Sequence, residues 1–88
     1  MIASGESDRG SLSRLLITAI LAGAENAVRL HIRRGDDLDA RDGRGMTPLM
    51  LAASKNKGAI CALLLSAGAN QSITDSVGRD ALALAKIA

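Results

Sequence analysis

Few side chains in this sequence have types suited to catalysis or metal binding, and the first to consider are one histidine and one cysteine. No cysteine or carboxylate is spaced from His31 so that two metal ligands would share one helix face. Cys61 lies in an apolar run, which is typical of a buried and unreactive thiol. A single cysteine cannot form an internal disulfide, so a reducing compartment is permitted and we expect the cytoplasm.

The acidic run at residues 36–43 must be compared with a calcium-binding loop. Counted from Asp37, carboxylates fall at loop positions one and three. Position five is Arg41, position six is Asp42 in place of glycine, and position twelve is Pro48 in place of glutamate. The run therefore predicts solvated turns, in which aspartate side chains accept hydrogen bonds from nearby backbone N–H groups.

Other catalytic arrangements are missing as well. The glycine-rich segment 43–45 lacks the Gly-Lys-Ser/Thr ending of a phosphate-binding loop. Ser11, Ser13 and Ser54 have no base beside them in any geometry that the sequence implies. The sequence thus predicts a protein that is not an enzyme and needs neither a metal nor another cofactor. The net charge of +2 is also too small to require a nucleic-acid or membrane partner.

The elements that hold these side chains are expected to be helices. The chain of 88 residues is 48% apolar but has no Phe, Tyr or Trp, which favours thin layers of closely spaced helices. Such a length predicts one domain near the lower limit for a self-sufficient core. No alternation is long enough for a strand. We expect an all-α fold with helices at residues 12–22, 25–34, 48–55, 58–67 and 81–87.

The clearest local signals surround the third of these helices. Thr47 is a good N-cap, and Pro48 stands at the first helical position, where its missing N–H costs nothing. Gly45 can adopt the positive φ of a tight turn. Asn56 tolerates the left-handed conformation that ends a helix, and Gly68 ends the next one. A helix–turn–helix unit is therefore predicted here.

This unit resembles an ankyrin repeat. The residues that carry the resemblance are Asp42, Gly45, Thr47-Pro48-Leu49, Leu51-Ala52-Ala53, Ile60, Leu64-Leu65 and Gly68-Ala69-Asn70. One position departs from the family, which usually has His where this chain has Met50. The hydrogen bond between Thr and His that the resemblance implies therefore cannot form.

Internal repetition extends the resemblance over most of the chain. Asp42 and Asp75 are 33 positions apart, which is the period of ankyrin arrays. We expect a polar tail at 1–10 and a solenoid of repeats at 11–41, 42–74 and 75–88, the last without its second helix. The same shift places His31 at the position of Leu64, in or beside the core, and lets Asp80 cap the last helix.

Residues 11–24 admit a second interpretation, as a secretory signal. Arg14, a short apolar run and an Ala-Gly-Ala ending imitate one, but Glu6 and Asp8 stand in what should be its basic region. The run is also too short to span a bilayer. The repeat register accounts for this stretch better.

In ankyrin-like modules, the turn tips and the exposed faces of the first helices form a concave binding surface. The resemblance implies binding positions of that kind at Arg41, Gly43, Arg44, Met46, Met50, Ser54, Lys55, Thr74, Ser76, Val77 and Arg79. Their mixture of basic and apolar side chains suits an acidic or mixed acidic–apolar protein segment. The alternative is that these charges only keep the surface soluble. Nucleic-acid binding is disfavoured because aromatic stacking residues are absent and aspartates are interleaved with the basic side chains.

The last helix lacks a partner helix and a polar cap, which a terminal repeat needs. We expect Leu82 and Ala85 to pack on the preceding repeat and Leu84 and Ile87 to stay partly uncovered. Such an end predicts a piece of a longer protein, a regulatory or structural segment that packs on its own neighbouring domain, or a homodimer through this helix. The alternative is that the helix simply folds back on the preceding repeat.

Overall fold

The computed structural model describes residues 13–87, and within that range it contains helices and no strand. The helices are α2 (Arg14–Ala22), α3 (Glu25–Arg33), α4 (Pro48–Ser54), α5 (Gly58–Ser66) and α6 (Ala81–Ile87). All five expected helices are present, so the all-α prediction is confirmed. The first begins later than expected, because Ser13 is extended and serves as its N-cap. The tail predicted for residues 1–10 lies outside the described residues.

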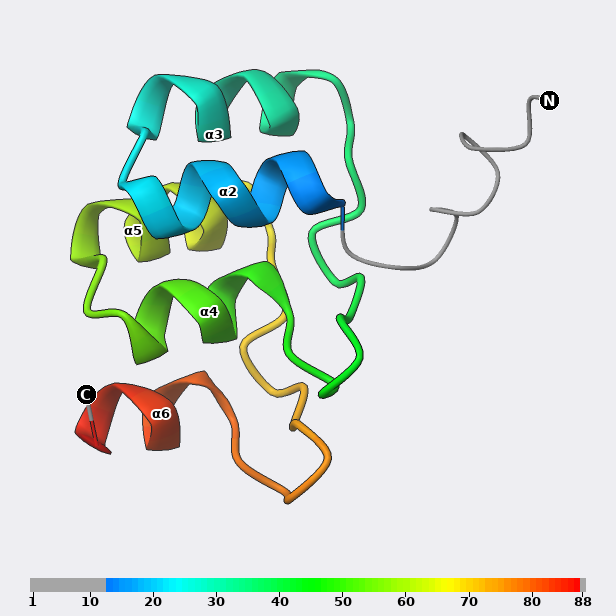
Figure 1. The fold of residues 1–88 in the computed structure, drawn as a ribbon, viewed down its shortest axis with the longest axis vertical. Coiled ribbons are helices and arrows are strands. Elements are labelled where there is room, and N and C mark those ends of the chain that lie inside the picture. Colours follow the sequence, from blue (N-terminus) through cyan, green and yellow to red (C-terminus); the bar gives the residue numbers. More distant parts are fainter. Residues whose placement is uncertain (1–12, 88) are drawn as a thin grey trace, which may run out of the picture.

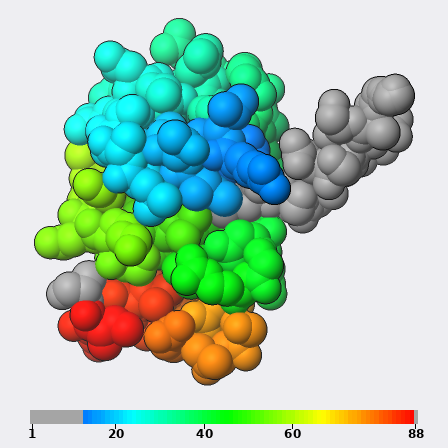
Figure 2. Space-filling view, viewed as in Figure 1, coloured from blue at the N-terminus to red at the C-terminus, as the bar shows by residue number. Residues whose placement is uncertain are grey.

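The helices form two stacked columns (Figure 1). Helices α2, α4 and α6 follow one another along the long axis, and α3 and α5 form the second column, with α3 at the top of the view and α5 partly behind α2 and α4. Helix α2 packs on α3, and α4 packs on α5, within their repeats; α4 also packs on α2 and α6, and α3 packs on α5, between repeats. The space-filling view shows the same succession, with α6 at one end of the stack (Figure 2). This arrangement is the expected solenoid.

The local signals around α4 act as the sequence predicts. The backbone N–H of Met50 donates a hydrogen bond of 3.3 Å to the hydroxyl of Thr47, which is the N-cap. Pro48 is the first residue of the helix. Gly45 and Asn56, before and after the helix, have φ values of 79° and 59°. Asp80 caps α6 in the same way, by accepting the N–H of Ala83 at 2.9 Å.

Each turn tip is built around one aspartate, and the two tips match. Oδ1 of Asp42 accepts the backbone N–H groups of Arg44 and Met46 at 2.8 and 2.9 Å. One period later, Oδ1 of Asp75 accepts those of Val77 and Arg79 at 3.0 and 2.9 Å. The tips therefore share one hydrogen-bonding pattern, which explains why the 33-residue repeat is clearest at these aspartates.

The two tips also touch each other. The backbone N–H of Ser76 donates to the carbonyl of Arg44 at 3.2 Å. A Cβ placed on Gly45 would come within 3.1 Å of the same Ser76 nitrogen. Glycine is therefore required at this position both by its positive φ and by the close approach of the neighbouring tip.

The hydrophobic core consists of Leu, Ile, Val, Ala and Met side chains and is centred on α4. Every residue from Pro48 to Ala53 is buried, because α2, α5 and α6 enclose the helix. The other helices add mainly branched side chains: Leu16, Ile20, Val28, Ile60, Leu64 and Leu84. Among residues 13–87 no helix has both the length and the apolar character needed to cross a membrane.

The packing of α6 differs from the expectation. Leu84 is only 3% exposed, whereas Leu82 is 65% and Ile87 68% exposed, and Ala85 is exposed as well. The prediction was therefore wrong for Leu82, Ala85 and Leu84, and correct for Ile87.

The repeat register explains this exchange. The residue equivalent to Leu84 is buried in repeat two (Leu51) but exposed in repeat one (Thr18), so this position needs a preceding repeat to cover it. The position of Leu82 is buried in both earlier repeats, as Leu16 and Leu49, where a second helix follows in the chain. Helix α6 packs against a preceding repeat, but in the described structure no second helix of its own repeat packs on it. Leu84 is therefore covered and Leu82 is not.

Candidate functional site

A groove of about 280 Å³ lies where the turn tips meet the facing sides of α4 and α6. It is lined by Arg44, Met46, Ser54, Lys55, Arg79, Leu84 and Ile87. The structure thus brings together five of the eleven positions at which the sequence predicts binding. The positions that do not line the groove are Arg41, Gly43, Met50, Thr74, Ser76 and Val77. We call this site the α4–α6 groove.

Three cationic side chains stand around the α4–α6 groove. Arg44 and Arg79 come from successive turn tips, and Lys55 follows the last turn of α4. All three are exposed, and Lys55 forms no ion pair with any other described residue. A negatively charged group in the groove would therefore meet Lys55, which is unpaired among the described residues, and two arginines whose charges Asp42 and Asp75 partly offset.

The aspartates at the tips orient the two arginines. Nε and one terminal nitrogen of Arg79 each lie 3.0 Å from Oδ2 of Asp75. A terminal nitrogen of Arg44 lies 3.7 Å from Oδ2 of Asp42, which is a looser contact. The backbone N–H of Arg79, with further help from Val77 N–H and the Arg79 guanidinium, lowers the pKa of Asp75 against the opposing effect of burial. The carboxylate is thus held ionised and keeps Arg79 in place.

Two of the expected contact residues are buried. Met46 is 5% exposed and Met50 is 1% exposed, and both belong to the core. The sequence analysis assumed that α4 has an open face, but α2, α5 and α6 surround it. Met46 therefore underlies the α4–α6 groove and Met50 supports the helix, and neither offers the apolar surface that was expected of it.

The remaining expected contact residues are exposed but lie elsewhere on the tips. Arg41 and Thr74 occupy equivalent positions of successive repeats, and Val77 is 70% exposed at the second tip. The exposed apolar part of the groove comes instead from Ile87 of α6, which was not among the expected binding positions, whereas Leu84 lines the groove but is only 3% exposed. The repeat shift could have identified Ile87, because its equivalent one period earlier is Ser54, which is one of the expected binding positions.

His31 and Cys61, the first residues considered for catalysis or metal binding, lie in environments typical of structural residues. His31 is buried in α3, and its Nδ1 lies 2.6 Å from Oδ2 of Asp36, so the pair closes the turn after the helix. Cys61 is half-buried rather than fully buried, and the loss of solvent raises the pKa of its thiol, which makes it a poorer nucleophile. No group of three or more potential metal ligands occurs in the described part of the chain.

The acidic run forms turns, as predicted. Oδ1 of Asp37 accepts the backbone N–H of Asp39 at 2.9 Å. Oδ1 of Asp39 in turn accepts the N–H of Asn70 at the same distance and so joins the loops of two repeats. Both carboxylates thus accept hydrogen bonds from backbone N–H groups. The sequence predicted this role for the acidic run once the comparison with a calcium-binding loop had failed.

Comparison with known proteins agrees with this architecture. Residues 15–87 match the family model described as ankyrin repeats (3 copies). Over 63 residues the chain is 38% identical to ankyrin repeat protein FPV219 of Fowlpox virus (strain NVSL), and the match covers 72% of this chain. It covers only 14% of that protein, so the chain spans a small part of the relative's length. With its helix pairs, its matching turn tips and its period, the chain belongs to the ankyrin repeat family.

Proposed function

We propose that the chain is a protein-interaction module whose partner binds in the α4–α6 groove. Ankyrin repeats generally mediate protein–protein interaction, which supports this class of function. The observation that carries the choice of site is the convergence of Arg44, Lys55 and Arg79 around the exposed side chain of Ile87. An acidic or mixed acidic–apolar segment of a partner protein fits this combination of charge and apolar surface.

The site is suited to recognise carboxylates. A guanidinium presents paired N–H donors to a carboxylate, and such charged hydrogen bonds are stronger than neutral ones. Because Asp75 already holds Arg79 in one orientation, less side-chain freedom is lost when a partner binds. Ile87 adds apolar area beside these charges.

A selection from a random phage-displayed peptide library tests the proposal. We expect the selected peptides to be enriched in Asp and Glu beside apolar residues. They should bind the Arg44→Gln/Arg79→Gln variant more weakly than the wild type. The matched control is Arg14→Gln/Arg34→Gln, which removes the same charge from exposed positions outside the groove. Equal binding to both variants would show that the groove is not the site.

A second candidate function is self-association through the open side of α6. Leu82 lies where both earlier repeats bury a leucine, and Leu65 of α5 is also exposed. A helix therefore fits this surface, and a second copy arranged about a two-fold axis would supply one. A neighbouring domain of a longer protein is the alternative occupant.

Sedimentation over a concentration series tests the self-association. We expect the wild type to dimerise and Leu82→Lys to remain monomeric. Leu82 does not line the α4–α6 groove, so this substitution leaves the first site intact. A wild type that stays monomeric throughout would refute the dimer.

Nucleic-acid binding by the same basic side chains is less favoured. Asp42 and Asp75 offset the charges of the two tip arginines, and the chain has no aromatic residue for base stacking. A cytoplasmic location stays a prediction from the single cysteine.

A further inference from the structure

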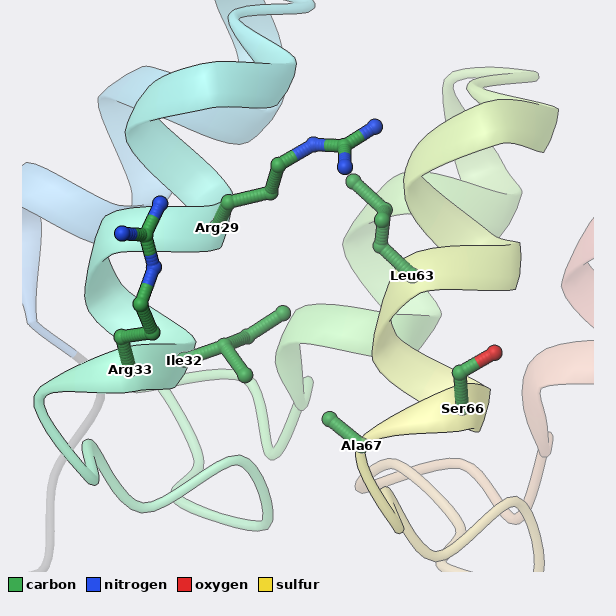
Figure 3. A pocket seen from close by; sticks show the side chains of 6 residues that line it. All are labelled: Arg29, Ile32, Arg33, Leu63, Ser66 and Ala67. Carbon is green, nitrogen blue, oxygen red and sulfur yellow. The ribbon is translucent and has the colours of Figure 1, made fainter.

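A second groove runs between α3 and α5, on the column of helices that does not contribute to the α4–α6 groove. It has a volume of about 380 Å³ and is lined by Arg29, Ile32, Arg33, Leu63, Ser66 and Ala67 (Figure 3). The first three residues belong to α3 and the others lie on or directly after α5. We call this site the α3–α5 groove.

The floor of the α3–α5 groove is apolar. Ile32 points from α3 towards α5, where Leu63 and Ala67 stand opposite it (Figure 3). Ile32 and Leu63 are half-buried and pack against the core, and Ala67 is exposed. The side chains of Ser66 and Ala67 are small and protrude little from this face of α5. A side chain of a partner could therefore reach the floor of the groove.

Two arginines form one rim of the groove. Arg29 and Arg33 are four residues apart on α3, which places them on adjacent turns of the same helix face. Arg29 reaches across towards Leu63 (Figure 3). Its only ion pair within the described residues is with Glu25, at 3.9 Å between half-exposed groups, which is a weak interaction.

No carboxylate lines this groove. Arg33 forms no ion pair with another described residue, and both arginines are exposed. The repeat shift places Ala62 and Ser66 at the equivalent positions of α5, so the pair of charges belongs to this one helix and is not required by the repeat.

We propose that the α3–α5 groove is a docking site for an acidic amphipathic helix of a partner protein. The helix would carry carboxylates on adjacent turns, opposite Arg29 and Arg33, and its apolar side chains would lie on Ile32, Leu63 and Ala67. Two charges at helical spacing beside an apolar floor match one face of such a helix in both spacing and chemistry. This site does not depend on the α4–α6 groove, so the module would have two separate binding surfaces.

A pair of synthetic helical peptides provides the probe. One peptide has glutamates on adjacent turns beside a leucine face, and the other has glutamines in place of the glutamates. Titration of the isotopically labelled full chain, followed by backbone amide NMR shifts, locates the binding site. We expect the largest shifts at residues 29–33 and 63–67, with the glutamate peptide bound about tenfold more tightly than the glutamine peptide.

Two variants separate the groove from the rest of the surface. Arg29→Gln/Arg33→Gln should weaken binding of the glutamate peptide about tenfold, and Ala67→Glu should weaken it further by placing a carboxylate in the groove. The matched control is Arg14→Gln/Arg34→Gln, which removes the same charge from exposed positions outside both grooves and should leave binding unchanged. Circular dichroism checks that every variant is folded.

Three outcomes would overturn the proposal. They are no binding of the glutamate peptide to the wild type, equal binding of both peptides, and shifts centred on the α4–α6 groove. Vesicles containing phosphatidylserine form a further arm of the experiment. If the wild type binds these vesicles through Arg29 and Arg33 but does not bind the peptide, the groove recognises anionic lipid and the helix proposal is wrong.

Discussion

Replacing Thr47 by valine exchanges its hydroxyl for a methyl group at the centre of the fold and nearly keeps the shape of the side chain. Thr47 is 1% exposed, and its hydroxyl accepts the N–H of Met50 at 3.3 Å. Valine cannot accept this bond, so a buried N–H at the start of α4 loses its partner. The loss of a Thr cap costs about 1 kcal/mol, and a buried unsatisfied donor costs about 1–3 kcal/mol. Because the bond is long, we expect the lower value, about 1 kcal/mol.

For a domain of this size, about 1 kcal/mol lowers the melting temperature by about 4–8 °C. The urea midpoint should fall by about 0.5–1 M for the m-value of a small domain. Unfolding has to be followed by far-UV circular dichroism, since the chain contains no Trp or Tyr. The control is Ser72→Val, because Ser72 is exposed and only its backbone N–H is bonded, to Oδ1 of Asn70. Equal midpoints for the two variants would refute the assignment of Thr47 as a structural cap.

Four further substitutions test other parts of the fold. Gly45→Ala should destabilise the chain by about 1–2 kcal/mol in urea melts, because alanine is strained at a φ of 79° and its Cβ would crowd Ser76. The lowered pKa of Asp75 means that the folded state binds protons less readily than the unfolded one, so its stabilisation is present above about pH 4 and disappears as the pH falls further. Asp75→Asn should therefore be less stable than the wild type at neutral pH and differ less from it at acid pH, as measured by thermal melts at each pH. At a protein concentration low enough to keep the chain monomeric, Leu84→Lys should lower the melting temperature strongly and Leu82→Lys hardly at all, because only Leu84 is buried. Equal effects would contradict the observed packing of α6.

The elements that local chemistry determines could be predicted from the sequence. A cap residue followed by proline sets the start of α4, and glycine or asparagine at positive φ sets the turns before and after it. These preferences depend on a few neighbouring residues, so they do not require knowledge of the rest of the fold. The repeat period then assigns the other helices, since Asp42 and Asp75 build the same turn.

What could not be predicted is which neighbour covers each face of a helix. Met50 was expected at an exposed edge, but α4 is enclosed on all sides. Leu82 and Leu84 were assigned to the wrong faces for the same reason: spacing shows that two residues point in different directions, but not which direction has a partner. The α3–α5 groove depends on the sizes of side chains on two helices that are far apart in the sequence. A pattern within one short stretch of sequence cannot predict such a groove.

The tip aspartates connect the stability of the fold with the candidate binding site, and the geometry keeps the two roles separate. In both Asp42 and Asp75, Oδ1 accepts the backbone N–H groups that shape the turn, whereas Oδ2 contacts the arginine that lines the α4–α6 groove. Removing the guanidinium therefore leaves the bonds that form the turn in place. Arg44→Gln/Arg79→Gln should stay folded in circular dichroism, with a melting temperature lowered only by the loss of the Arg79–Asp75 ion pair, while losing affinity for acidic peptides. If the variant failed to fold, the arginines would be part of the turn rather than ligands for a partner, and the proposed α4–α6 site would lose its main support.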